Sequence, residues 1–246
     1  MKITTGVHRL GSGLINAYLV EENGEVTIID AGLPGYWADL PAELAAMGRA
    51  LTDVRAVVLT HGHTDHIGFA ERARTELKVP VSVHEIDAAL ARGEIPNGAG
   101  RAGSIRIGPL LRFLVLNLSK GALRTKHLAE VSTFGDGATL DLPGSPRVIL
   151  LPGHTPGSAA LHFASLGALF VGDAMATISV ASGFSGPMIA PFSADRVTAL
   201  ASLARLDDVE AAWLLPGHGL PWTGGVDTAV TKIRNDEATA AQARSR

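Results

Sequence analysis

Short runs of β-branched and other apolar residues alternate with turn residues over the first 30 positions of the chain. Three of these runs, at residues 3–7, 15–20 and 26–30, predict strands. Asn23-Gly24 lies between the last two runs, and this dipeptide is typical of a tight hairpin turn. The chain is therefore expected to begin with a meander of antiparallel strands.

Strands and helices alternate in the next part of the chain. Apolar positions recur at helical spacing in three segments, which are residues 36–48, 69–77 and 85–92. Continuous apolar runs predict two buried strands between these helices, at residues 54–60 and 79–83. Pro41 lies inside the first helical segment and marks the position where that helix begins or breaks.

The pattern lapses after Gly93 and resumes as a second series of strands. These strands are expected near Val131, Thr139, Val148 and Ala160, and at residues 169–172 and 213–215. Two helices are expected among them, at residues 193–206, with Ser193 as the N-cap and Asp195 in the first turn, and at residues 226–243. Two halves that are each strand-rich and then helical predict two sheets packed face to face, with helices outside.

Composition limits the classes of function. The chain has 246 residues, of which 46% are hydrophobic and 18% charged, as in a soluble globular protein, and this length allows one large domain or two small ones. A formal net charge of −3 provides no basic field for nucleic acid. The first ten residues contain no apolar signal segment, and residues 105–118 are interrupted by two arginines and a proline and are shorter than the roughly 20 residues of a spanning helix. We therefore expect a cytoplasmic protein with no nucleic-acid or membrane partner.

The chain has no cysteine and nine histidines. The absence of cysteine excludes disulfides, thiolate-bound clusters and a cysteine nucleophile. Any metal site must therefore be made of imidazole and carboxylate groups.

The strand predicted at residues 54–60 leads directly into His61-Gly62-His63-Thr64-Asp65-His66. Side chains in such a loop can converge on one point, and neutral imidazole and carboxylate are ligands of Zn²⁺. A solvated polar turn is the alternative for one or two histidines. Four candidate ligands in six residues favour a metal site.

Three later residues share this setting. His154, Asp173 and His218 each follow a predicted strand, and each has a glycine directly before it. A lone histidine after a strand is more often an ordinary loop residue, but the repeated arrangement weakens that explanation.

These motifs, HxHxDH, PGHTPGS, GDA and PGHG in that order, resemble those of the metallo-β-lactamase superfamily, and the resemblance covers nearly the whole chain. It implies an α/β fold, an αββα sandwich of two mixed sheets flanked by helices, as a single domain over residues 1–246 with a two-metal site on one edge. By this resemblance one metal is held by His61, His63 and His154, a second by Asp65, His66 and His218, and Asp173 bridges the two. Asp30 matches a family aspartate that supports a ligand histidine; without the family, capping of a turn explains it equally well.

The implied activity is metal-dependent hydrolysis. Two Zn²⁺ ions, or Mn²⁺ or Fe, would share a hydroxide that attacks the carbonyl of a small ester, thioester or lactone, and Asp65 would carry the proton to the leaving group. A small phosphodiester hydrolase and a mononuclear iron enzyme similar to sulfur dioxygenases are the alternatives, and a binding protein that has lost catalysis is a third class.

Other features of the sequence help to distinguish between the branches of this family. True β-lactamases carry a cysteine or serine where this chain has Asp173, and glyoxalase II has a helical domain for which the 28 residues after His218 are too few. Lactonases usually place a tyrosine beyond the bridging aspartate, whereas the only tyrosines here are Tyr18 and Tyr36. Within the family, the full set of seven ligands nevertheless looks more like the branch of glyoxalase II, lactonases, phosphodiesterases and esterases, and it implies no specific substrate.

Two segments are candidates for the substrate pocket. Residues 174–194 contain no charged side chain, and their apolar residues, Met175, Ile178, Phe184, Met188, Ile189 and Phe192, predict either a pocket wall or a buried connection. Residues 94–129 are a long insertion whose part from Ile95 onward has six basic residues and no acid. It is a solvated face, a lid over a substrate with an apolar acyl or ring part, or the interface of a homodimer. The remaining histidines are expected to be structural, with His127 as the best candidate for substrate contact; they are His8, His84, His127 and His162.

Overall fold

The computed structural model describes residues 1–98 and 100–244; Ala99 in the expected insertion, and Ser245 and Arg246 at the end of the expected domain, lie outside the described residues. The first part of the chain forms a seven-stranded sheet in sequence order. Its strands are β1 (Lys2–Thr4), β2 (Val7–Gly11), β3 (Asn16–Glu22), β4 (Glu25–Ile29), β5 (Val54–Val58), β6 (Val81–His84) and β7 (Ser132–Phe134). Strands β1 to β4 are antiparallel, as the meander predicted, and β4 to β7 are parallel.

A second sheet is built from the later strands in the order β13, β10, β9, β8. Its strands are β8 (Arg147–Leu150), β9 (Ala159–Phe163), β10 (Ala168–Gly172) and β13 (Trp213–Pro216). Strands β10 and β13 are parallel and the other pairs antiparallel, so both sheets are mixed. A separate hairpin is formed by β11 (Ala176–Ile178) and β12 (Ser185–Met188).

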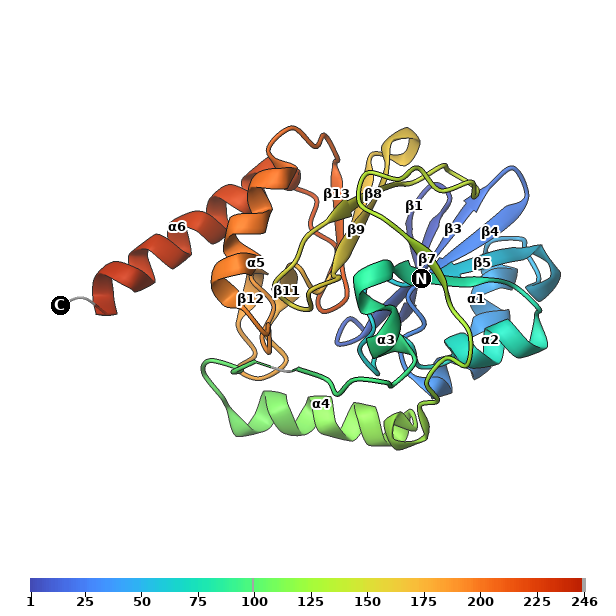
Figure 1. The fold of residues 1–246 in the computed structure, drawn as a ribbon, viewed down its shortest axis with the longest axis horizontal. Helices are drawn as coiled ribbons and strands as arrows, with labels where there is room; N and C mark the ends of the chain where they lie inside the picture. The colour runs from blue at the N-terminus through green and yellow to red at the C-terminus, as the bar shows by residue number, and fades with distance from the viewer. Residues whose placement is uncertain (99, 245–246) are drawn as a thin grey trace.

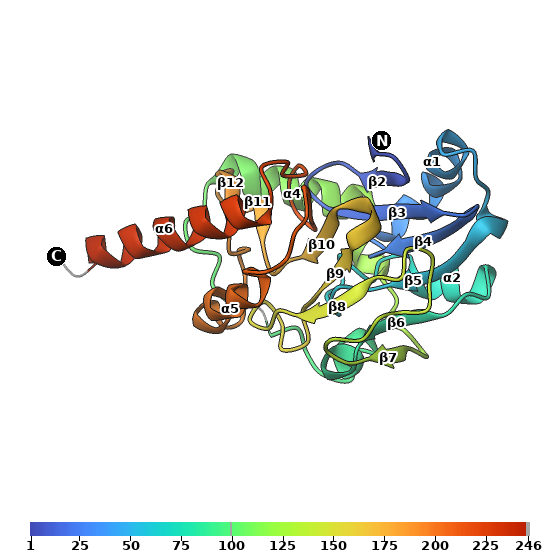
Figure 2. The same cartoon turned by 90° about the horizontal axis from the view of Figure 1, so that it is seen from above.

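Helices cover the outer faces of the two sheets (Figures 1 and 2). Helices α1 (Leu40–Ala46), α2 (Ala70–Glu76) and α3 (Ala88–Ala91) share a buried cluster with the first sheet. Helices α5 (Arg196–Ser202) and α6 (Val226–Arg244) share one with the second sheet. A third cluster joins the sheets, and includes Val20, Ile29, Val58, Leu161 and Phe170. The predicted αββα sandwich is confirmed.

Several expected elements differ in detail. The strand expected at residues 3–7 is two strands, because Gly6 has a φ of +72° and turns the chain between β1 and β2. Pro41 is in the first turn of α1, so the helix begins there, after a 3₁₀ turn at Pro34–Ala38. The strand expected near Thr139 is only an isolated bridge to Arg147.

The expected N-cap of the helix at residues 193–206 was wrong. Asp195 is the N-cap of α5, and its carboxylate accepts a hydrogen bond from the Thr198 N–H at 2.9 Å. The Ser193 hydroxyl instead donates to the Ala190 carbonyl and lies 3.3 Å from His154 Nδ1. The helix that follows Asp195 continues as a 3₁₀ turn at Leu203–Leu206.

The insertion contains a helix that the sequence pattern did not predict, α4 (Ile107–Ser119). It runs along one edge of the molecule, apart from the two helical layers (Figure 1). Phe113 and Leu116 pack against the core of the first sheet, which holds the helix over that edge. Among the described helices, none is both long and apolar enough to cross a membrane.

Candidate metal centre

The loop after β5 carries four of the expected ligand residues. His61, His63 and His66 are buried, whereas the carboxylate side chain of Asp65 is 20% exposed. Gly62 is required between the first two histidines, because a Cβ there would lie 2.8 Å from the backbone nitrogen of Ala91. The close approach of α3 therefore fixes the path of this loop.

The second sheet supplies the other three residues. His154 follows β8, Asp173 follows β10 and His218 follows β13, and all three are buried. The preceding glycines are sterically required: a Cβ on Gly153 would lie 2.3 Å from the Ala199 nitrogen, and a Cβ on Gly217 would lie 2.4 Å from Asp173 Oδ1. The repeated glycine seen in the sequence thus makes room for the site.

The structure brings all seven expected residues together at the edge shared by the two sheets. Their potential donor atoms form three groups, and within each group all the atoms lie within 4.8 Å of one another. The groups are His61 with His63 and His154; His61 with His66 and Asp173; and Asp65 with His66 and His218. Asp173 lies between them, with Oδ1 3.4 Å from His66 Nε2 and Oδ2 3.0 Å from His218 Nε2 and 3.4 Å from His154 Nε2.

Most of these imidazoles are oriented by a contact on Nδ1. His61 Nδ1 lies 3.1 Å from the Thr60 hydroxyl, His66 Nδ1 lies 2.9 Å from Asp30 Oδ2, and His218 Nδ1 contacts the Leu14 carbonyl. The Nε2 atoms of these rings are consequently left to face the centre. Such outer contacts fix the tautomer and the ring plane of metal-ligating histidines.

The donor set fits a metal ion. The Nε2 atoms of His61 and His66 and Oδ1 of Asp173 are buried and have no hydrogen-bond partner within the described residues. Buried polar atoms rarely lack a hydrogen-bond partner, so a cluster of three needs an explanation. His63 Nδ1 lies 3.0 Å from His154 Nε2. Two nitrogen ligands of a tetrahedral zinc ion, each at about 2.05 Å, lie about 3.3 Å apart, which is close to that separation.

Burial and mutual charge set the ionisation of the cluster. Burial lowers the pKa of His61 well below its ordinary value and lowers that of His154 to about 4, so both are neutral ligands at pH 7. Burial opposes charge on His66 too, but Asp30 and Asp173 raise its pKa well above the ordinary value.

His218 and Asp173 form the charged pair of the cluster. Burial disfavours charge on His218, but Asp173 raises its pKa to about 9; burial likewise opposes charge on Asp173, but His218 and the neighbouring imidazoles hold its pKa well below the ordinary range. Metal ions at neutral pH would therefore have to displace protons from His66 and His218.

Asp30 lies where the resemblance placed it. It is buried with a φ of +57°, and its carboxylate accepts hydrogen bonds from the Thr60 N–H at 2.8 Å and from the Thr60 hydroxyl at 2.8 Å. Because the same carboxylate contacts His66 and Thr60 contacts His61, one acid orients two imidazoles.

Asp87 was missed by the sequence analysis. It is 1% exposed, and its carboxylate accepts hydrogen bonds from Gly62 N–H at 2.9 Å, Gly157 N–H at 2.8 Å and the Thr155 hydroxyl at 2.8 Å. One carboxylate thus joins the loop of His61 and His63 to the loop of His154. No pattern around Asp87 in the sequence shows these distant partners.

A cavity of about 200 Å³ opens over the cluster. Besides five of the seven clustered residues, its walls are formed by Thr64, Asn97, Phe113, Asn117, Val180 and Phe192. Of the uncharged segment 174–194, Val180 and Phe192 therefore reach the cavity, while Met175 and Ile189 are buried in the core. Asn97 and Asn117 were not singled out from the sequence, where amides in an irregular insertion carry no distinctive signal.

The basic residues of the insertion and the remaining histidines lie elsewhere. No lysine or arginine is among the described residues that line the cavity, and neither is His127, which lies against Gly93. The other three of these histidines contact residues outside the cavity: His8 contacts Glu43, His84 contacts the Ile86 N–H, and His162 contacts the Glu210 carbonyl.

Comparison with known families agrees with this geometry. The family model described as the metallo-beta-lactamase superfamily matches residues 10–218, which include all seven clustered residues. The chain belongs to the metallo-beta-lactamase superfamily. The family of the resemblance and its fold are therefore confirmed.

One of two similar curated proteins is named as a probable metallo-hydrolase. The chain is 29% identical over 236 residues to the probable metallo-hydrolase YflN of Bacillus subtilis. The aligned residues cover 89% of this chain and 86% of YflN. It is 30% identical over 211 residues to the uncharacterized protein YobT of the same organism, covering 83% of each. The name of the first relative supports a metal-dependent hydrolase, and neither name gives a substrate.

Solved structures share the fold. The metallo-beta-lactamase family protein TTHA1429 of Thermus thermophilus superimposes with a TM-score of 0.69 at 24% identity, covering 98% of this chain and 82% of that one. A structure of TTHA1623 described as a di-iron-bound form superimposes with a TM-score of 0.62 at 28% identity, covering 90% and 96%.

Proposed function

We propose that this metallo-hydrolase is binuclear and cleaves small, uncharged esters, thioesters or lactones. The observation that carries the proposal is the group of three buried atoms without a hydrogen-bond partner, Nε2 of His61, Nε2 of His66 and Oδ1 of Asp173. In this proposal His61, His63 and His154 hold one ion, Asp65, His66 and His218 hold the second, and Asp173 is shared. Zn²⁺ suits this set of imidazoles and carboxylates, although the same ligands also accept manganese or iron.

The proposed reaction divides its roles between the metal ions and the side chains of the protein. When bound, they would supply a hydroxide at neutral pH and a Lewis acid for the substrate carbonyl. The protein's own groups do the rest. Asp65, the most exposed acid of the cluster, faces the cavity and is placed to accept a proton and return it to the leaving group.

The cavity supports an uncharged substrate. Phe113, Val180 and Phe192 form its apolar wall, and the amides of Asn97 and Asn117 offer hydrogen bonds for a carbonyl or hydroxyl group. Its volume of about 200 Å³ is smaller than the roughly 300–1,000 Å³ of pockets for drug-sized ligands. A phosphodiester would lack a cationic side chain here, which is why we place it second.

The test combines metal analysis with a substrate screen on one purified sample. We expect two metal ions per chain and turnover of short-chain lactones, esters or thioesters in preference to phosphodiesters and β-lactams. One iron per chain would refute the binuclear proposal, and turnover of phosphodiesters alone would refute the carbonyl substrate.

A pair of variants tests the shared ligand. Asp173→Ala should lose at least one ion and nearly all turnover, whereas Asp208→Ala, at an exposed position, should keep both. Wild-type turnover in Asp173→Ala would show that the bridge is assigned wrongly.

A further inference from the structure

The outward face of α4 is a continuous apolar stripe. Ile107 is 84% exposed and Leu118 is 62% exposed, and the same face carries Leu111, Leu114 and Val115. Ile107, Leu111, Leu114 or Val115, and Leu118 follow one another at intervals of three or four residues, so they lie on one side of the helix. Beyond the ends of the helix the stripe continues into Ile105 and Leu123, which are 61% and 87% exposed.

The hairpin beside α4 extends this stripe. A Cβ on Gly183 would lie 2.8 Å from the Pro109 ring, so the tip of the loop between β11 and β12 touches the start of the helix. The next residue, Phe184, is 51% exposed.

Helix α4 is apolar on both of its faces. Its inner face, with Phe113 and Leu116, packs on the core, while the stripe faces outward. An exposed apolar patch of this length marks a binding surface.

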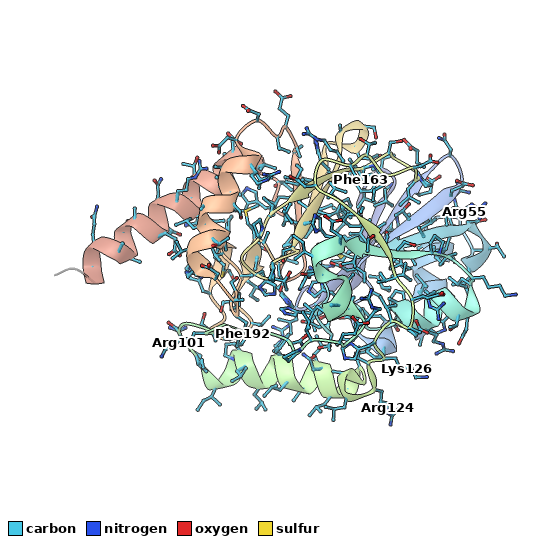
Figure 3. All side chains as sticks on the ribbon, viewed as in Figure 1. Arg55, Arg101, Arg124, Lys126, Phe163 and Phe192 are labelled. Atoms are coloured by element: carbon cyan, nitrogen blue, oxygen red, sulfur yellow. The ribbon has the colours of Figure 1, made fainter. Side chains whose placement is uncertain are left out.

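The charged residues of the segment that carries the stripe are all basic. From Ile95 to Ala129 the chain has six basic residues and no acid. Within the described part of the chain, Arg101, Arg106, Arg112 and Arg124 form no ion pair, whereas Lys120 pairs with Asp39. Figure 3 shows Arg101 beside the amino-terminal end of α4, and Arg124 and Lys126 beside its other end. The apolar stripe therefore lies between basic side chains, and Arg101 at one end and Arg124 at the other form no ion pair within the described residues.

We infer that this face docks on an anionic lipid surface. An apolar helix face enters the boundary between headgroups and acyl chains, and flanking arginines contact the anionic headgroups. A second copy of the chain fits less well, because two such faces would bring the same basic residues together. The sequence argued against a membrane partner because no segment can span a bilayer, but docking on the surface needs no spanning segment.

The docking face and the catalytic cavity share one helix. Phe113 and Asn117, on the inner side of α4, line the cavity beneath it. A bilayer on the outer side would thus lie one helix diameter, roughly 10 Å, from the proposed site. Binding to lipid is independent of the proposed hydrolysis, so failure of either leaves the other testable.

The experiment measures co-sedimentation of the intact protein with vesicles and uses no substrate. Vesicles of phosphatidylcholine containing about 30% phosphatidylglycerol are compared with pure phosphatidylcholine, at low and high salt. We expect binding to the anionic vesicles only, weakening as salt rises.

Two matched pairs of variants locate the face. Leu111→Glu with Leu118→Glu should abolish binding, whereas Val197→Glu, at an 81% exposed position on α5, should not. Arg101→Gln with Arg124→Gln should weaken binding about twentyfold or more, since each basic residue near such a surface contributes roughly fivefold. Arg55→Gln with Arg147→Gln changes two exposed arginines on other elements and should bind as the wild type does.

Retained folding of each variant is checked by circular dichroism, and its mass in solution by light scattering. The proposal is overturned if the wild type ignores anionic vesicles, or if the α4 variants bind as well as their controls. A dimer that only the leucine variants dissociate, with no lipid binding, would assign the stripe to a second copy instead.

Discussion

The structure predicts that Asp87 supports both the fold and the metal centre, although it touches none of the proposed ligand side chains. Its carboxylate accepts hydrogen bonds from the Gly62 N–H, the Gly157 N–H and the Thr155 hydroxyl, and all three hydrogen bonds are buried. The Thr155 hydroxyl also lies 2.8 Å from Ser158 Oγ and keeps a partner without Asp87. Asp87→Ala would therefore leave two backbone donors unpaired.

The size of the effect follows from those two donors. An unpaired buried donor costs about 1–3 kcal/mol, so Asp87→Ala should lower the free energy of unfolding by about 4 kcal/mol. Asp87→Asn keeps one acceptor oxygen and should cost about half as much. Because both loops carry metal-binding candidates, metal affinity should also fall, by roughly 10- to 100-fold as for other outer-contact residues.

Two measurements check this prediction. Urea unfolding of the metal-free proteins gives the free energy of unfolding, and competition with a chromophoric chelator gives the zinc affinity. Asp208→Ala, an exposed aspartate, is the control and should change neither. If Asp87→Asn bound zinc as tightly as the wild type, the idea that Asp87 sets the spacing of the two loops would be wrong.

Three further predictions concern the metal, a glycine and an ion pair. Removing metal with a chelator should lower the Tm by about 10 °C, because about 4 kcal/mol of binding energy is lost, and zinc should restore it; a Tm that is indifferent to both would argue against a bound ion. Gly153→Ala should lower the free energy of unfolding by at least about 2 kcal/mol because its Cβ would meet the Ala199 backbone, whereas Gly108→Ala, in open space, should be tolerated; urea titrations compare the two. Hydrogen bonds from Arg74 lower the pKa of Glu71, so its stabilisation is present above the unfolded-state pKa and disappears as pH falls through the lower folded-state value. Glu71→Gln should therefore destabilise the protein at pH 7 more than at pH 3, and equal losses at the two pH values would exclude this ion pair as the cause.

The candidate site could be predicted from the sequence because its ligands are concentrated in short, glycine-marked loops. His61, His63, Asp65 and His66 lie within six residues, and Gly153, Gly172 and Gly217 precede the other three. The physical requirement for these glycines is local crowding, which leaves a pattern that the chain itself displays. Asp87 leaves no such pattern, because its partners Gly62 and Gly157 are backbone groups 25 and 70 positions away.

The missed helix has a different cause. Periodicity identifies a helix by the contrast between an apolar and a polar face, and α4 carries apolar residues on both faces. Its inner residues pack on the core and its outer apolar residues are exposed, so the apolar positions do not form the single stripe expected of one buried face. The wrong N-cap arose from competition between two good candidates, Ser193 and Asp195, since the Ser193 hydroxyl already bonds to Ala190.

Because the proposed ligands are divided between the two sheets, cleavage of the chain between the sheets would separate them. A break in the connection between β7 and β8 would leave His61, His63, Asp65 and His66 on one fragment and His154, Asp173 and His218 on the other. Neither fragment would then hold three ligands of the first ion, and the second ion would lose His218 from its set. Metal capture would become a reporter of fragment complementation, with tight binding appearing only when the two halves reassemble.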